Sequence, residues 1–143
     1  MNIRAATQAD YAELRNIYLE SRRARFHWAN PEELSLQDFD TDTVEEYIIV
    51  AENEEGQLLG FASLYLPDNF IHHLFVHPGF IGIGVGARLL EASIANMEQP
   101  IRLKCVSENH NAMGFYERQG WKKVIEEGTP GKKYWVMEYD TNS

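Results

Sequence analysis

The feature that most constrains this 143-residue chain is a run of three alternate glycines between an apolar strand and an apolar helix. The strand ends at Val76, Pro78 removes a ladder donor after it, and the glycines are Gly82, Gly84 and Gly86. Glycine accepts a positive φ and lets the backbone approach a ligand, while the first amides of a helix carry the positive end of its dipole. The segment therefore predicts a backbone cradle for a small anion such as a pyrophosphate. The alternative is a strand-to-helix turn that binds nothing.

Composition narrows the class of protein. With 44% hydrophobic and 12% aromatic residues the chain is globular, and its length fits a single domain over residues 1–143. A net charge of −9 argues against a nucleic-acid partner, because a phosphate backbone calls for a broad basic surface. The sequence has no apolar stretch suited to a bilayer, no signal core at its amino terminus, and Cys105 as its single cysteine. We therefore expect a cytoplasmic protein with no membrane partner.

Periodicity and turn signals predict an α/β fold with a mixed, mostly antiparallel sheet of six or seven strands, flanked by three or four helices. The strand, helix and strand around the glycines should form a parallel pair. Strands are expected near residues 3–5, 47–51, 58–66, 70–76, 101–106, 121–125 and 133–139, and helices after Thr7, near residues 34–39, after Gly86 and over residues 109–119.

Acidic residues crowd residues 32–46, and such a stretch is more often a solvated face than a site for a cationic substrate. We expect the solvated face. Residues 22–42 have the least regular pattern, so we look there for the acceptor-substrate site. Arginines could hold an acidic group of the substrate and aromatic residues could line a pocket, although solvated arginines and packing aromatics are more common. The residues concerned are Arg22, Arg23, Arg25, Phe26 and Trp28, and the acidic ones are Glu32, Glu33, Asp38, Asp40, Asp42, Glu45 and Glu46.

A second group of residues, Asn109, Ala112 and Tyr116, has spacings of three and four. On a helix these residues share one face. Taken alone, such a tyrosine is usually a core aromatic whose hydroxyl has found a partner.

Both segments resemble the GNAT superfamily of acetyl-CoA-dependent N-acetyltransferases. The run from Ile81 to Gly86 is similar to the family's glycine signature, in which the first residue is Gln or Arg. Ile81 departs from that pattern, but the family's phosphate contacts are largely backbone amides, which Ile81 still supplies. The run from Asn109 to Trp121 matches the family's Asn-x-x-Ala-x-x-Phe-Tyr-x-x-x-Gly-aromatic pattern at every named position. The resemblance covers essentially the whole chain.

The resemblance implies that acetyl-CoA lies between the strands at 70–76 and 101–106. Its pyrophosphate would lie on the segment Ile81 to Gly86, here called the glycine loop, and its pantetheine beside the first strand. It also implies contacts from the helix that follows Asn109, and a possible homodimer. The implied cofactor-binding residues are Phe75, Val76, Ile81, Gly82, Ile83, Gly84, Val85, Gly86, Ala87, Asn109 and Ala112.

Transfer to an amine needs a base, because an alkyl ammonium with a pKa of ~10 has no lone pair to attack a thioester. His72 and His73 are candidates, and His72 occupies a position where family members of this kind place an acidic base. Strand alternation would let only one of them face the reacting centre, and a distant residue or water remains an alternative. Tyr116 would be the general acid that protonates the departing thiolate.

Two other functions stay open at this point: a non-catalytic acyl-CoA sensor, and a dinucleotide-binding protein. Gly82, Gly84 and Ala87 also fit the dinucleotide fingerprint, with Glu108 about twenty residues on.

Cys105 should be a small buried hydrophobe. We predict no metal, because the chain has no Cys and His spacing typical of zinc and the two histidines should point to opposite faces. The acceptor could be a small polyamine, an amino acid, an aminoglycoside-like molecule or a protein amino group.

Overall fold

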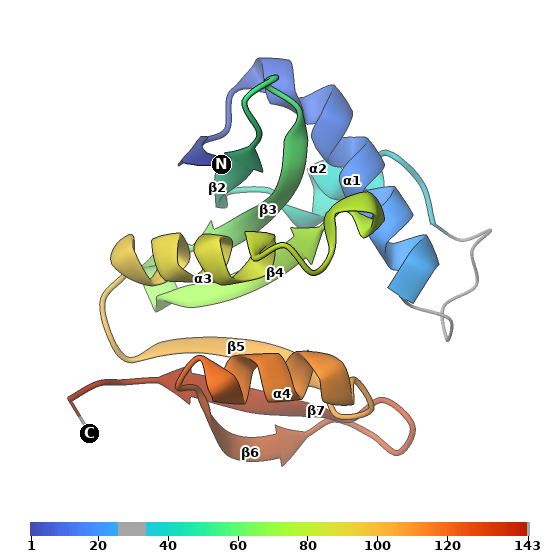
Figure 1. Ribbon diagram of the computed structural model, residues 1–143. Coiled ribbons are helices and arrows are strands. Elements are labelled where there is room, and N and C mark those ends of the chain that lie inside the picture. Colours follow the sequence, from blue (N-terminus) through green and yellow to red (C-terminus); the bar gives the residue numbers. More distant parts are fainter. Residues whose placement is uncertain (26–33, 143) are drawn as a thin grey trace.

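The computed structural model describes residues 1–25 and 34–142, which form one sheet with helices on both faces (Figure 1). The strands are β1 (Asn2–Ala5), β2 (Tyr47–Glu52), β3 (Leu58–Tyr65), β4 (Phe70–Val76), β5 (Ile101–Val106), β6 (Lys122–Glu127) and β7 (Tyr134–Tyr139). The helices are α1 (Tyr11–Arg25), α2 (Asp38–Asp42), α3 (Val85–Ala95) and α4 (His110–Arg118). Among the described residues, no helix is long and apolar enough to cross a bilayer.

The seven strands follow the order β1-β2-β3-β4-β5-β7-β6. Only β4 and β5 run parallel, because the chain crosses over through α3 between them; the other neighbouring pairs are antiparallel. The expected α/β fold with a mixed, mostly antiparallel sheet is confirmed. That residues 1–143 make a single domain stays a prediction.

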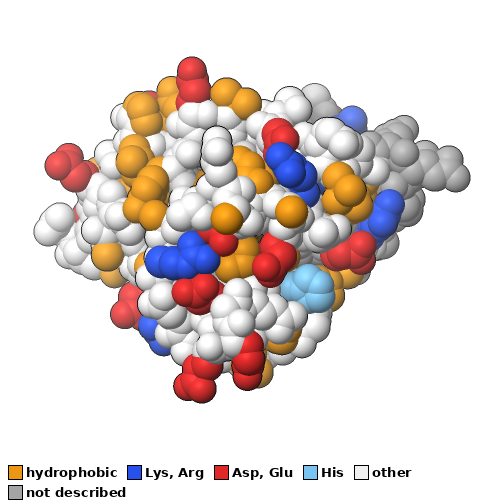
Figure 2. Space-filling model, turned by 90° about the horizontal axis from the view of Figure 1, so that it is seen from above, with side chains coloured by type: hydrophobic (Ala, Val, Ile, Leu, Met, Phe, Trp, Pro, Cys, Tyr) orange, Lys and Arg blue, Asp and Glu red, His pale blue; other side chains and the backbone are white. Residues whose placement is uncertain are grey.

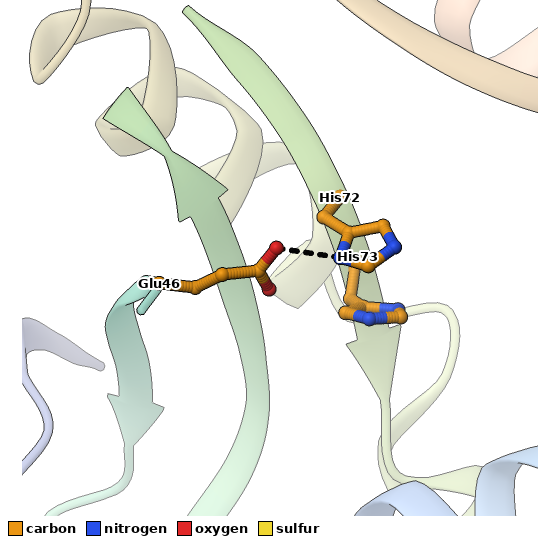
Figure 3. Close-up of side chains that lie close together, drawn as sticks. All are labelled: Glu46, His72 and His73. Carbon is orange, nitrogen blue, oxygen red and sulfur yellow. Dashed lines mark hydrogen bonds and ion pairs between the residues drawn. The ribbon is translucent and has the colours of Figure 1, made fainter. Parts of the chain in front are cut away.

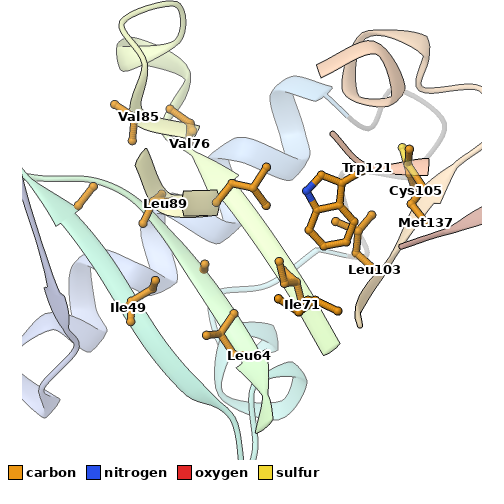
Figure 4. Close-up of a cluster of buried hydrophobic side chains, with 14 of the residues drawn as sticks. Ile49, Leu64, Ile71, Val76, Val85, Leu89, Leu103, Cys105, Trp121 and Met137 are labelled. Atoms are coloured by element: carbon orange, nitrogen blue, oxygen red, sulfur yellow. The ribbon is translucent and has the colours of Figure 1, made fainter. Parts of the chain in front are cut away.

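Each face of the sheet carries its own core, because successive side chains of a strand point to opposite faces. Ile49 and Ala51 of β2 join the core under α3, which continues past β5 and β7 to α4 (Figure 4). Ile48 and Val50 join the other core, where α1 and α2 cover the sheet. In that second core, four aromatic rings pack against one another edge to face or stacked: Tyr18, Phe39, Phe61 and Phe75.

Several expected boundaries differ from those in the structure by one to a few residues. The short helix expected near residues 34–39 is instead α2, Asp38–Asp42. Phe39, at 0% exposure, lies in its first turn and not at its end. The sixth strand begins at Lys122 and not at Trp121, whose side chain is 2% exposed and belongs to the core beside α4. The strands expected at 70–76 and 101–106 are confirmed at both ends.

A network of charged hydrogen bonds holds Asp10, the residue just before α1. Both guanidinium nitrogens at the tip of Arg4 donate to the Asp10 carboxylate, at 2.8 and 2.9 Å, and the Thr7 N–H donates to it at 2.8 Å. This last bond is one half of the expected capping box. Hydrogen bonding from Arg4 lowers the pKa of Asp10 from 3.8 to about 2.

The lowered Asp10 pKa predicts an acid-dependent stability. Because the folded-state pKa lies below the unfolded value, the stabilisation is complete above the unfolded pKa and is lost as the pH falls toward about 2. At about pH 6, Asp10→Asn should lower the free energy of unfolding by about 1–2 kcal/mol, and the two proteins should converge as the pH approaches about 2. Urea unfolding of both proteins across that range checks this. A constant difference would contradict it.

Candidate active site

The glycine loop has the backbone geometry that a bound anion requires. Gly82 and Gly84 have φ values of 90° and 88°, and a Cβ added to either would meet nothing within 4 Å. Gly84 is the N-cap of α3, and no side chain caps that end of the helix. Because the first amides of a helix lack partners within it, the amides that follow Gly84 are suited to bind an anion. The flanking Ile81 and Ile83 side chains are 53% and 60% exposed.

Three of the predicted segments meet at Gly86. A Cβ placed on this residue would lie 3.6 Å from Val76 Cγ2, at the end of β4, and 3.6 Å from the Phe115 ring on α4. The start of α3 therefore packs closely against both. Phe115 is far from Val76 and Gly86 in the sequence, and the fold brings α4 into contact with the glycine loop and the end of β4.

Asn109 and Ala112 have a local structural role. Asn109 is the N-cap of α4, and its side-chain oxygen accepts a hydrogen bond from the Ala112 N–H at 3.2 Å. Tyr116 is half-buried one turn further along, and its ring packs edge to face against Phe115 at 5.3 Å and Trp121 at 6.1 Å. That Asn109 and Ala112 also contact a cofactor stays a prediction, as does the role of Tyr116.

The ladder between β4 and β5 is short. It joins Phe70 to Arg102 and Ile71 to Leu103, at the start of each strand. The expected cofactor position lies between the later parts of these two strands. At the end of β4, the Val76 carbonyl accepts a hydrogen bond from Ser21 Oγ of α1 at 3.2 Å. The predicted pantetheine contacts of Phe75 and Val76 remain untested.

The expectation that His72 and His73 point to opposite faces is wrong. Ser63 of β3 pairs with His73, but the next residue, Leu64, pairs with Ile71, so His72 is an extra residue on β4. Such a β-bulge re-aims a side chain and breaks the alternation. The two imidazole rings lie 3.9 Å apart, at 34° to each other, on the same side of the strand (Figure 3). The reason for expecting no metal at these histidines therefore fails.

Glu46 is a candidate site residue that the sequence pattern did not single out. It precedes β2, and its side chain reaches across β3, where it accepts a hydrogen bond from Ser63 Oγ, to His72 on β4 (Figure 3). The Glu46 carboxylate lies 2.5 Å from His72 Nδ1, and the side chain is only 6% exposed against 44% for His72. Since a carboxylate accepts, Nδ1–H is the donor, and in the neutral ring the lone pair is on Nε2.

His73 has a different environment from its neighbour. Its ring packs against Tyr18 at 5.3 Å and Phe75 at 6.1 Å, and its Nε2 lies 3.2 Å from the Asp42 carbonyl oxygen. Burial lowers the pKa of His73 to about 4, so this imidazole is neutral at physiological pH. Because a carbonyl can only accept, the proton of the neutral ring is on Nε2.

Comparison with known proteins now identifies the family. The model of the acetyltransferase (GNAT) family matches residues 11–121 of the chain, which include the glycine loop and α4. The chain belongs to the GNAT family. No curated protein matches it in sequence. Because the family match contains the glycine segment, it does not support the dinucleotide-binding alternative.

Solved structures of GNAT proteins have the same fold. Apo-form YjaB from Escherichia coli is 26% identical, with a TM-score of 0.75 and 96% of each chain covered. The ribosomal-protein-alanine N-acetyltransferase of Brucella melitensis is 21% identical, with a TM-score of 0.70 and coverage of 96% of this chain and 98% of that one. The Salmonella typhimurium yncA, a putative acetyltransferase solved with its cofactor acetyl-CoA, is 18% identical with a TM-score of 0.73, covering 99% and 94%.

The family uses acetyl-CoA, and the glycine loop of this GNAT domain fits that group. The two positive-φ glycines leave open space where any other residue would place a Cβ, next to a helix end without a side-chain cap. This combination suits the close approach of a pyrophosphate to backbone amides. Family membership supports an acetyltransferase, and the residues present are compatible with its donor.

Four carboxylates in the acidic stretch of this GNAT domain have partners, and the side chain of one of them, Asp40, is still 45% exposed. Arg22 is also not a free arginine: it is 7% exposed and lies 3.9 Å over the Tyr18 ring. Arg23 pairs with Glu20 at 3.7 Å. On the face in Figure 2, acidic side chains lie scattered among basic and hydrophobic ones and form no continuous acidic patch. The pairs are Asp38 with Arg22, Asp40 with Arg15, Asp42 with Tyr18, and Glu46 with His72.

Other sequence predictions concern residues off this site. Cys105 is buried, as expected, and burial raises the pKa of its thiol to about 11, so it is not a thiolate nucleophile. Phe26, Trp28, Glu32, Glu33 and the side chain of Arg25 lie outside the described residues.

Proposed function

We propose that this protein is an N-acetyltransferase that moves an acetyl group from acetyl-CoA to a primary amine by direct attack in a ternary complex. The observation that supports this most is the packing at Gly86, where the glycine loop, the end of β4 and the helix of Tyr116 come together. A cradle for a diphosphate thus lies beside the segments that carry the candidate acid and base.

In this proposal, backbone amides from Ile81 to Ala87 hold the pyrophosphate, and the strand at Phe75 and Val76 lies along the pantetheine. Asn109 and Ala112 contact the cofactor from the start of α4. Bound acetyl-CoA supplies an activated acyl thioester. The protein's own part is to bind this donor, to orient the amine against it and to exchange protons with both.

His72 accepts the proton of the ammonium. Its Nε2 has the lone pair, and its 44% exposed side chain is open to a substrate. Glu46 acts through His72: the carboxylate holds Nδ1–H, which fixes the tautomer and the orientation of the ring. Buried His73 is not the base, because its lowered pKa makes it a poor proton acceptor at neutral pH.

Tyr116 donates its phenolic proton to the departing CoA thiolate. It lies on the same helix as Asn109, and its neighbour Phe115 contacts Gly86 of the glycine loop. This packing supports the proposal that the phenol lies near the bound cofactor.

Release of free thiol from acetyl-CoA that depends on added amine is the test of this function. A panel of polyamines, amino acids, aminoglycosides and amino-terminal peptides also identifies the acceptor class. Tight binding of acetyl-CoA without release on any amine would favour the sensor alternative. The cytoplasmic location, the homodimer and the absence of membrane and nucleic-acid partners also stay proposals.

Gly84→Ala should weaken acetyl-CoA binding about tenfold, because the added methyl enters the open space of the cradle and the αL conformation is strained. Isothermal titration with acetyl-CoA measures this. Gly56→Ala is the matched control: Gly56 has a φ of 79°, is also open around its Cβ position, and lies in the β2–β3 hairpin. Both variants should lose about 1 kcal/mol of stability, and only Gly84→Ala should lose affinity. Equal affinities would exclude the loop from cofactor binding.

A further inference from the structure

We propose that Glu46, His72 and His73, here called the bulge cluster, bind a zinc-class divalent cation, and that the bound ion inhibits acetyl transfer. The inhibitory half rests on the function proposed above, since it requires His72 to be the base. The binding half stands on the geometry of the cluster alone (Figure 3).

The cluster offers the ligands that zinc prefers. Each of the three residues provides one nitrogen or oxygen atom, and these atoms all lie within 4.8 Å of one another. Two imidazoles and one carboxylate are a frequent zinc ligand set that leaves a fourth position for water or another ligand. The β-bulge is what brings the set together, because a regular strand would separate the two imidazoles.

Neighbouring groups hold two of the three ligands in place. The Asp42 carbonyl accepts from His73 Nε2–H, so the lone pair of that ring is on Nδ1. Ser63 Oγ, which is buried, donates to the Glu46 carboxylate. Hydrogen bonds from a ligand to a backbone carbonyl, or from a hydroxyl to a ligating carboxylate, are the supporting contacts of metal sites.

His72 is the ligand that must move. Its Nδ1 lies 2.5 Å from the Glu46 carboxylate, whereas two ligands of one tetrahedral zinc ion lie about 3.4 Å apart. The His72 side chain is 44% exposed, so it can turn without disturbing the core. The negative carboxylate of Glu46 and the net charge of −9 both favour a cation here.

An ion in the bulge cluster would block the reaction in two ways. It would engage the imidazole that accepts the ammonium proton, and its positive charge would repel the ammonium substrate.

Thermal unfolding of tag-free protein with and without zinc chloride, followed by calorimetric titration, tests the site without any substrate. We expect one ion per chain, a higher Tm with zinc, and affinity at least ~10-fold weaker in Glu46→Gln and in His73→Asn. His110→Gln is the control, because His110 is an exposed histidine on α4, outside the cluster, and its loss should leave zinc affinity unchanged. Circular dichroism verifies that each variant folds.

The inhibitory half is tested by measuring the acetylated amine, since zinc also binds free thiols. Stoichiometric zinc should abolish product formation, and a chelator should restore it. No binding, or binding that both Glu46→Gln and His73→Asn retain, would overturn the site. Binding that leaves acetylation intact would overturn inhibition. Specific binding in a protein that acetylates no amine would support the site and contradict the proposed acetyltransferase instead.

Discussion

Tyr116→Phe is expected to lower the turnover of amine acetylation roughly 10²-fold, while the Kd for acetyl-CoA stays nearly unchanged. The substitution removes only the hydroxyl, so the ring keeps its edge-to-face contacts with Phe115 and Trp121 and the fold is preserved. The thiolate then leaves without a positioned proton donor. Steady-state kinetics with acetyl-CoA titration separates the two quantities.

Tyr139→Phe is the matched control for this prediction. The Tyr139 ring also packs on Trp121, at 5.6 Å, but Tyr139 belongs to β7 and not to α4. Loss of its hydroxyl should leave turnover within a factor of about two. If Tyr116→Phe behaves in the same way as Tyr139→Phe, the phenol has no part in proton transfer.

His72→Ala should also lower turnover by roughly 10²-fold, because the ammonium then loses its positioned base. The exposed side chain contributes little to the core, so thermal stability should change little. Binding of acetyl-CoA, measured by calorimetry, should be unaffected. Glu46→Gln should cause a smaller loss of turnover, since the amide can still hold the His72 ring but without a charge.

His110→Ala is the control for the base, since it removes an exposed histidine from α4 rather than from β4. It should keep the activity of the parent protein. Full activity of His72→Ala, on an amine that the parent acetylates, would show that the proton leaves through another residue or through water.

The regular strands and helices were predictable because their signals are local. The strands at 70–76 and 101–106 were predicted to the residue, and a crossover helix between them requires a parallel pair. The glycine loop was predictable for the same reason: Gly82 and Gly84 have the positive φ that their residue type permits. The capping of α4 by Asn109 lies within one turn, but the cap was not foreseen from the family pattern.

The base site was only half predictable. His72 could be named from its position, but its partner Glu46 is 26 residues away and lies across an intervening strand. Nothing in the acidic stretch distinguishes Glu46 from Asp38, Asp40 and Asp42, which also have partners in the folded chain. The His72 and His73 rings lie close together because the strand register shifts opposite Ser63 and Leu64. The alternation of residue types along the strand gives no sign of that shift.

The sequence by itself determined the family, the glycine cradle and the helix that carries Tyr116, because each depends on residue types at short, fixed spacings. Only the tertiary structure decided which charged groups pair, which histidine is buried, and that Glu46, His72 and His73 form one cluster. These outcomes depend on strand register and burial, and both are set by contacts between residues that are far apart along the chain.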